Sequence, residues 1–159
     1  IVTHLEPIMN QQIDTLKKVR VFLLESIKDL TTDQWNKIPE GFNNNIAWNL
    51  GHLIAAQQGM CYERANLTPH ITDEFWEQFR TGSKPGADLS AGEIENLKSL
   101  FLTLMDQLDA DYNNQIFGNY TAWSTRYGVE ITLIEHALRF VTYHEGLHGR
   151  AIGALKRLL

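Results

Sequence analysis

The sequence predicts an all-α protein, a four-helix bundle with long crossover connections. Four long segments place apolar residues three and four positions apart, which is the spacing of a helix with one buried face. The clearest stripes are Leu16, Val19, Leu23, Ile27 and Leu30 in the first segment, and Ile94, Leu97, Phe101, Leu104 and Leu108 in the third. Nothing in the chain resembles a run of strands or an internal repeat.

Helix-start signals place the first two helices. Thr3 and Glu6 have the spacing of a capping box, and Pro7 falls in the first turn, where its missing N–H costs little. Residues 31–35 resemble a short capped turn, and the segment Pro39-Glu40-Gly41 then breaks the chain. The second helix is expected to begin near Asn43 or Asn44, both good N-cap residues, and to run to about Asn66.

The other two helices follow long connections. Residues 67–89 form the first connection, which contains a small amphipathic piece at 72–79. Ser90 and Glu93 form a second capping box and open the third helix. A connection over 113–130 leads to the last helix, expected from about Ile131 to the end. Two long connections require at least one crossover in the bundle.

Composition indicates a single domain over residues 1–159 and narrows the function. The net charge of −5, without a basic stripe, argues against nucleic-acid binding. No apolar run is long enough to span a bilayer, and the first residues lack the features of a signal peptide. The single cysteine, Cys61, allows no intrachain disulfide and fits a reducing compartment. We therefore expect a cytoplasmic protein.

Two histidines of the last helix point toward the bundle interior. His144 and His148 are four residues apart, so they lie about 40° from each other on the helix. Apolar residues of the same helix lie within roughly 40° of His148; they are Ile134, Ala137, Val141, Ile152 and Leu155. Each imidazole in an apolar interior needs a partner. A satisfied core histidine is one explanation, but a pair with this spacing favours one bound metal ion.

A third ligand is expected from the second helix. His52 faces a small, partly polar side of that helix, away from the main apolar flank, where a ligand pocket would fit. Together with His144 and His148 it forms the predicted metal site. Cys61 lies about 180° from His52 on the helix and cannot share an ion with it. His4 and His70 are expected in solvent, and His136, about 120° from His148, is expected at the periphery.

The segment His144-Glu145-Gly146-Leu147-His148 matches the HExxH motif of zinc peptidases. Only 11 residues follow it, none of them a His, Asp, Glu or Cys that could supply a downstream third ligand. A peptidase is therefore a distant alternative. Glu145 lies about 60° from His148, close enough to be a catalytic base or an outer partner of the site. The alternative for Glu145 is a carboxylate paired with a Lys or Arg.

Two segments resemble the DinB/YfiT-like superfamily. The residues Asn45-Ile-Ala-Trp-Asn-Leu-Gly-His52-Leu are similar to its second-helix signature. The residues from His144 to Arg157 are similar to its last-helix signature, although Arg150 and Ala151 replace the usual Gly and Gln. The resemblance implies an up-down-down-up bundle with His52, His144 and His148 around Zn, Ni, Fe or Mn. Homodimers are common in this superfamily, so the resemblance also implies a homodimer.

Three neutral imidazoles leave a metal ion with at least one open position, which is typical of catalytic sites. Some similar proteins are thiol-dependent S-transferases or isomerases, and others are proposed hydrolases. The hypothesis is a metal-dependent enzyme acting on a small-molecule substrate, with a low-molecular-weight thiol. The rival interpretation is a non-catalytic, metal-stabilised dimeric bundle, for instance a stress-response or interaction protein. Trp48, Tyr120, Trp123 and Tyr127 are better explained as core or loop anchors than as substrate contacts.

Overall fold

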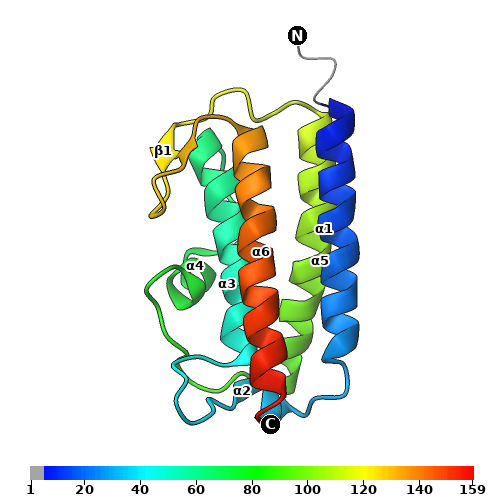
Figure 1. The fold of residues 1–159 in the computed structure, drawn as a ribbon, viewed down its shortest axis with the longest axis vertical. Coiled ribbons are helices and arrows are strands. Elements are labelled where there is room, and N and C mark those ends of the chain that lie inside the picture. Colours follow the sequence, from blue (N-terminus) through cyan, green and yellow to red (C-terminus); the bar gives the residue numbers. More distant parts are fainter. Residues whose placement is uncertain (1–5) are drawn as a thin grey trace.

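The computed structural model describes residues 6–159, with side chains from Ile8 onward. Four long helices dominate it: α1 (Glu6–Ser26), α3 (Ile46–Cys61), α5 (Ala91–Asn113) and α6 (Ile134–Lys156). Figure 1 shows them side by side, with α1 and α6 running downward and α3 and α5 running upward. Helix α3 packs against α5 and α6, and α1 packs against the same two helices. The all-α fold class predicted from the apolar spacing is confirmed.

Three shorter helical pieces lie in the connections: α2 (Thr32–Asn36), the 3₁₀ turn η2 (Glu63–Ala65) and α4 (Asp73–Phe79). Thr31 and Gln34 form a reciprocal capping box on α2. The capping box predicted at Ser90 and Glu93 is confirmed, because the Ser90 side chain accepts from the Glu93 N–H and the Glu93 side chain accepts from the Ser90 N–H. The box expected at Thr3 and Glu6 lies outside the described residues.

The expected ends of the second helix were wrong by a few residues. Asn45, not Asn43 or Asn44, is the N-cap of α3, and its side-chain oxygen accepts from the Trp48 N–H at 2.7 Å. The α-helix ends at Cys61, and the chain then tightens into η2. Asn66 closes that turn in the left-handed conformation, with φ 58°.

The last helix begins three residues later than expected, because Ile131 belongs to a small hairpin. Strand β1 (Trp123–Ser124) pairs antiparallel with β2 (Glu130–Ile131), with Trp123 opposite Ile131. Glycine is needed in the turn, where Gly128 has φ 75° and its N–H donates to the Thr125 carbonyl. Two-residue strands are too short for the alternation that identifies a strand from sequence.

Helix α4 packs directly on α3 because α3 carries glycine where the two meet. A Cβ atom added to Gly51 would overlap the ring of Phe79, and one added to Gly59 would lie 2.8 Å from the ring of Trp76. Figure 1 shows α4 beside the middle of α3, outside the bundle of four long helices. This close approach brings the C-terminal end of α4, with the Phe79 carbonyl, to the centre of α3.

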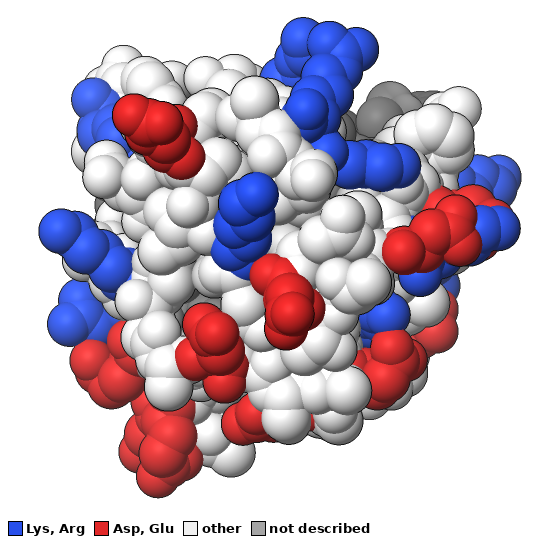
Figure 2. Space-filling model, turned by 90° about the horizontal axis from the view of Figure 1, so that it is seen from below, with Lys and Arg blue, Asp and Glu red and all other residues white. Residues whose placement is uncertain are grey.

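The charged side chains at the lower end of the bundle are mixed in sign. Figure 2 shows Lys and Arg interspersed with Asp and Glu on this face, separated by uncharged surface. A continuous basic stripe is not seen on the face in view. No helix in the described part of the chain has the length and apolar character needed to cross a membrane.

Candidate metal centre

The fold brings His52, His144 and His148 together between α3 and α6. One ring nitrogen of each lies within 4.8 Å of the corresponding nitrogens of the other two, an arrangement that could hold a metal ion. The His144 and His148 ring centroids are 4.6 Å apart, as expected for side chains one helical turn apart on the same face. His52 is buried, at 4% exposure, whereas the other two are half-buried. The partly exposed side of the triad is therefore the side formed by His144 and His148.

The orientation of the His52 ring is fixed by α4. Its Nδ1–H donates to the carbonyl oxygen of Phe79 at 2.8 Å. Since a carbonyl can only accept, the proton of the neutral imidazole resides on Nδ1. The Nε2 atom of His52 is left with its lone pair directed at the other two histidines. This is the usual way in which an outer oxygen atom orients a metal-binding histidine.

The His148 ring is fixed by a chain of amide groups at the start of α3. The Asn49 Nδ2 donates to the Asn45 carbonyl at 2.8 Å and to Asn44 Oδ1 at 3.1 Å. These two bonds turn the Asn49 Oδ1 atom toward His148, whose Nδ1–H donates to it at 2.8 Å. The Nε2 atom of His148 thus also has a free lone pair. Two of the three rings are in the tautomer that a metal needs.

The donor set and its spacing fit a divalent ion. A tetrahedral zinc ion with Zn–N distances of 2.0–2.1 Å would set its ligand nitrogens about 3.3 Å apart. The Nε2 atoms of His52 and His144 are separated by 3.2 Å. Because the His52 atom has no proton, the His144 Nε2–H donates to it in the metal-free protein. To bind an ion through Nε2, His144 must carry its proton on Nδ1 instead.

The surroundings keep all three histidines neutral. Burial, followed by the nearby rings of His148 and His52, lowers the pKa of His144 to about 3. Burial and the His52 ring lower the pKa of His148 to about 4. The pKa of His52 is also lowered, chiefly by burial, against the opposing effect of its bond to Phe79. Neutral imidazole is the form that binds a metal, so protons compete weakly here.

These shifts predict a pH dependence of the metal-free protein. The folded-state pKa values lie below the value of about 6.5 in the unfolded chain, so the unfolded state binds more protons as the pH falls. Stability is therefore complete above about pH 6.5 and is lost progressively toward pH 4. Thermal denaturation at several pH values should show this fall, and a His144→Gln/His148→Gln variant should show a flatter profile. If the wild type and the double variant lost stability in parallel as the pH falls, the histidines would not be the source of the pH dependence.

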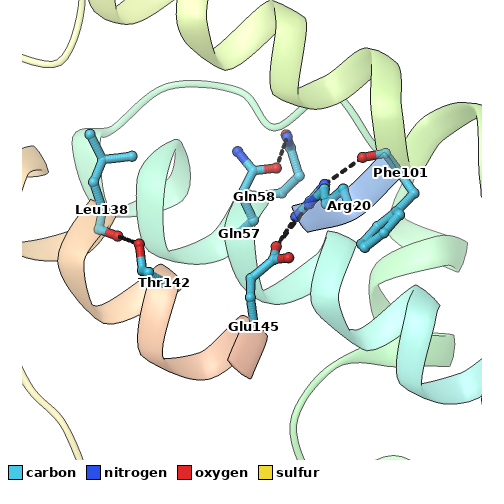
Figure 3. A network of polar contacts seen from close by, with 7 residues as sticks. All are labelled: Arg20, Gln57, Gln58, Phe101, Leu138, Thr142 and Glu145. Atoms are coloured by element: carbon cyan, nitrogen blue, oxygen red, sulfur yellow. Dashed lines mark hydrogen bonds and ion pairs between the residues drawn. The ribbon is translucent and has the colours of Figure 1, made fainter. Parts of the chain in front are cut away.

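Glu145 follows His144 in sequence but its carboxylate has a different environment. Figure 3 shows its side chain meeting Arg20 of α1 in the bundle interior. Glu145 Oε1 accepts from Arg20 Nε at 2.9 Å and forms an ion pair with Arg20 Nη2. Arg20 Nη1 donates to the Phe101 carbonyl at 2.6 Å, and the guanidinium lies over the Phe101 ring. These contacts match the alternative left open by the sequence, a carboxylate paired with an arginine.

The same contacts bear on the peptidase alternative. In an HExxH peptidase the glutamate must be free to take a proton from the attacking water. The Glu145 side chain is 3% exposed and is bound by a fully buried arginine. In addition, the third histidine comes from α3, upstream of the motif. Both observations argue against a peptidase, and a catalytic role for Glu145 stays a prediction.

The remaining candidates lie elsewhere. Cys61 is buried in the core beside Tyr62, and burial raises its thiol pKa to about 12. His136 contacts Thr132 at the start of α6. His70 is not simply solvated, because its ring packs edge-on against Tyr62 and its Nε2 lies 3.5 Å from Asp111. His4 is outside the described residues.

Sequence reasoning did not place four groups beside the triad. The Trp48 ring stacks on His52 with the planes 7° apart and the centroids at 4.8 Å, which its position four residues earlier could have indicated. Asn49 and the Phe79 carbonyl orient the rings, and Arg126 of the hairpin turn acts on all three histidines by its charge.

The small patch beside His52, expected to fit a pocket, is instead covered at Gly59 by Trp76 of α4.

The fold and the site together define a class of protein, an all-α bundle with a three-histidine centre on two of its helices. The family model of the DinB superfamily matches residues 15–152, which include all three histidines. The chain belongs to the DinB superfamily. Among curated proteins, no significant match to the chain is found.

Proposed function

We propose that this protein is a metal-dependent enzyme that joins a low-molecular-weight thiol to a small electrophile, or isomerises or hydrolyses a related substrate. His52, His144 and His148 are the proposed ligands of one Zn, Ni, Fe or Mn ion, within a bundle of the up-down-down-up type. The observation that carries the proposal is the preset orientation of His52 and His148, which directs two lone pairs at one point beside His144.

The proposed reaction needs a thiol or water molecule whose pKa is lowered, so that it can react in its deprotonated form. A divalent ion held by three neutral imidazoles supplies a Lewis acid with an open position, which lowers the pKa of a bound thiol or water. The residues of the chain hold the geometry and limit the access of water. Phe79 and Asn49 fix two of the rings, and Trp48 covers one face of His52. The half-buried side of the triad, on α6, is the side left for substrate.

The transfer reaction is balanced without any further redox partner. The sulfur atom forms a bond to an electrophilic carbon. The bond from that carbon to its leaving group breaks, and the leaving group takes the electron pair. The thiol proton goes to solvent. In an isomerisation or an addition no group leaves, and a carbon of the substrate takes up a proton. Glu145 is the proposed base that would take up the proton in such a step, and its carboxylate is paired with Arg20.

The test is a rate measurement with defined reagents. Protein loaded with Zn²⁺ is mixed with 2-mercaptoethanol and 1-chloro-2,4-dinitrobenzene, and formation of the thioether is followed by absorbance. We expect a rate above that of the same thiol and Zn²⁺ without protein. His148→Ala should abolish the excess rate, whereas His136→Ala, on the same helix but outside the triad, should retain it.

The same variants separate an enzyme from the rival, a bundle stabilised by its metal without chemistry of its own. If the site is only structural, no thiol or electrophile in a wider panel will react faster with the protein. In that case His148→Ala will chiefly lower the melting temperature. An excess rate that persists in His148→Ala would also overturn the proposal, because it would then arise away from the triad.

Association as a homodimer in the cytoplasm, with no nucleic-acid or membrane partner, is the corresponding proposal for assembly. Support comes from an apolar face of α1 that the described part of the chain leaves exposed. Ile8, Val19 and Phe22 lie within about 60° of one another on the helix. Val19, which was expected in the buried stripe, is 45% exposed, and Phe22 is 74% exposed. A group of large apolar side chains exposed on one face of a helix is typical of an interface.

A further inference from the structure

We infer that Arg126 is a specificity residue of the same site, which binds an anionic group, such as a carboxylate, on the substrate. The inference rests on the proposed metal-dependent function and adds a substrate class to it. It arises from the hairpin between α5 and α6, which sequence reasoning treated only as a connection.

The turn that carries Arg126 is well defined. Thr125 Oγ1 accepts from the N–H groups of Tyr127 and Val129, at 3.3 and 3.2 Å. The Thr125 N–H donates to the Val129 carbonyl at 2.9 Å, and Gly128 completes the turn at φ 75°. Arg126 is therefore presented from a closed turn, while its side chain remains exposed.

Aromatic contacts hold this turn over α6 next to the triad. The Arg126 guanidinium lies 5.7 Å from the centroid of the Tyr127 ring. Tyr127 packs edge-on against Tyr143, with centroids 5.8 Å apart, and also contacts Phe140. Tyr143 immediately precedes His144 on α6. The hairpin turn thus lies at the level of His144, the first proposed metal ligand on α6.

The contacts of Tyr127 with Arg126 and with Tyr143 hold the Arg126 guanidinium against the stretch of α6 that carries His144. None of the ion pairs between residues that the structure describes involves Arg126. A guanidinium placed beside a bound divalent cation would repel it unless an anion lies between them. The arrangement favours a substrate whose negative group lies at Arg126 while its reactive sulfur or oxygen lies at the triad.

Three thiols of similar size test the inference by binding rather than by rate. Isothermal titration calorimetry of the Zn²⁺-loaded protein is performed with 3-mercaptopropionate, which is anionic, 2-mercaptoethanol, which is neutral, and cysteamine, which is cationic. We expect 3-mercaptopropionate to bind about tenfold more tightly than 2-mercaptoethanol, and cysteamine to bind most weakly. In Arg126→Gln the preference for 3-mercaptopropionate over 2-mercaptoethanol should fall to within about twofold.

Two further variants serve as controls. Arg126→Lys keeps the charge without the planar fork and should retain part of the preference. Arg139→Gln removes one positive charge from α6 at a position that lines a separate cavity beside β2, and should retain all of it. Each thiol is compared between the wild type and Arg126→Gln, so differences in acidity between the thiols cancel.

The failures of the inference and of the proposed function are distinguishable. Absence of bound Zn²⁺ in the wild type would overturn the proposed function, and this inference with it. Bound Zn²⁺ with equal affinities for the anionic and neutral thiols would overturn the inference alone. A preference for 3-mercaptopropionate that survives in Arg126→Gln would likewise overturn the role of Arg126 and leave the metal site standing.

Discussion

Replacing Arg20 by Met should lower the free energy of unfolding by about 3–5 kcal/mol. The substitution leaves the carboxylate of Glu145 buried without its counter-charge, and the Phe101 carbonyl loses a donor. Uncompensated burial of a charge is among the most destabilising single changes. The measurement is equilibrium unfolding in urea at pH 7, with the metal-free protein so that ligand binding does not contribute.

Two comparisons identify the cause of the loss. Lys17→Met breaks a more exposed ion pair, which joins α1 to Asp106 and Asp109 of α5, and should cost less than about 1 kcal/mol. Arg20→Met combined with Glu145→Leu removes both charges and should recover much of the stability. A loss of the same size in the Lys17 variant, or no recovery in the double variant, would show that the Arg20–Glu145 pair is not responsible.

Replacing His148 by Ala should weaken metal binding by more than about a hundredfold, because one of three protein ligands is removed. Replacing Asn49 by Ala leaves the three ligands in place but removes the acceptor that fixes the His148 tautomer. Its effect should be smaller, about 10- to 100-fold, as is typical of groups that orient a ligand. Competition titrations with a chromophoric chelator measure both values.

His136→Ala is the matched control, since it removes a histidine of α6 that contacts Thr132 rather than the triad. It should bind metal as the wild type does. Equal affinities for the wild type and the His148 variant would mean that the ion is bound elsewhere. Equal effects of the Asn49 and His136 substitutions would mean that the hydrogen bond to His148 has no influence on the ligand.

The helices and the pairing of His144 with His148 could be predicted because their signals are local. Apolar residues three and four apart identify a buried face, and the same periodicity directs His144 and His148 to one side of α6. The capping box at Ser90 placed the start of α5 within a residue. In each case the relevant residues are neighbours in sequence, so the helical geometry alone relates them.

The rest depends on contacts between distant segments. Nothing near Phe79 in sequence indicates that its carbonyl meets His52, 27 residues earlier. The hairpin strands have two residues each, and the position of Arg126 depends on how the turn packs against Tyr143. The environment of Glu145 likewise depends on Arg20, 125 residues away. The position of Glu145 beside His144 suggested a catalytic base, but in the folded protein its carboxylate is paired with Arg20 of α1.

The most direct measurement is the elemental composition of protein purified without a histidine tag, compared with that of a His144→Ala variant. We predict about one divalent ion per chain in the wild type and almost none in the variant. Equal metal contents in the two proteins, whether zero or one, would contradict the assignment of His52, His144 and His148 as a shared metal site.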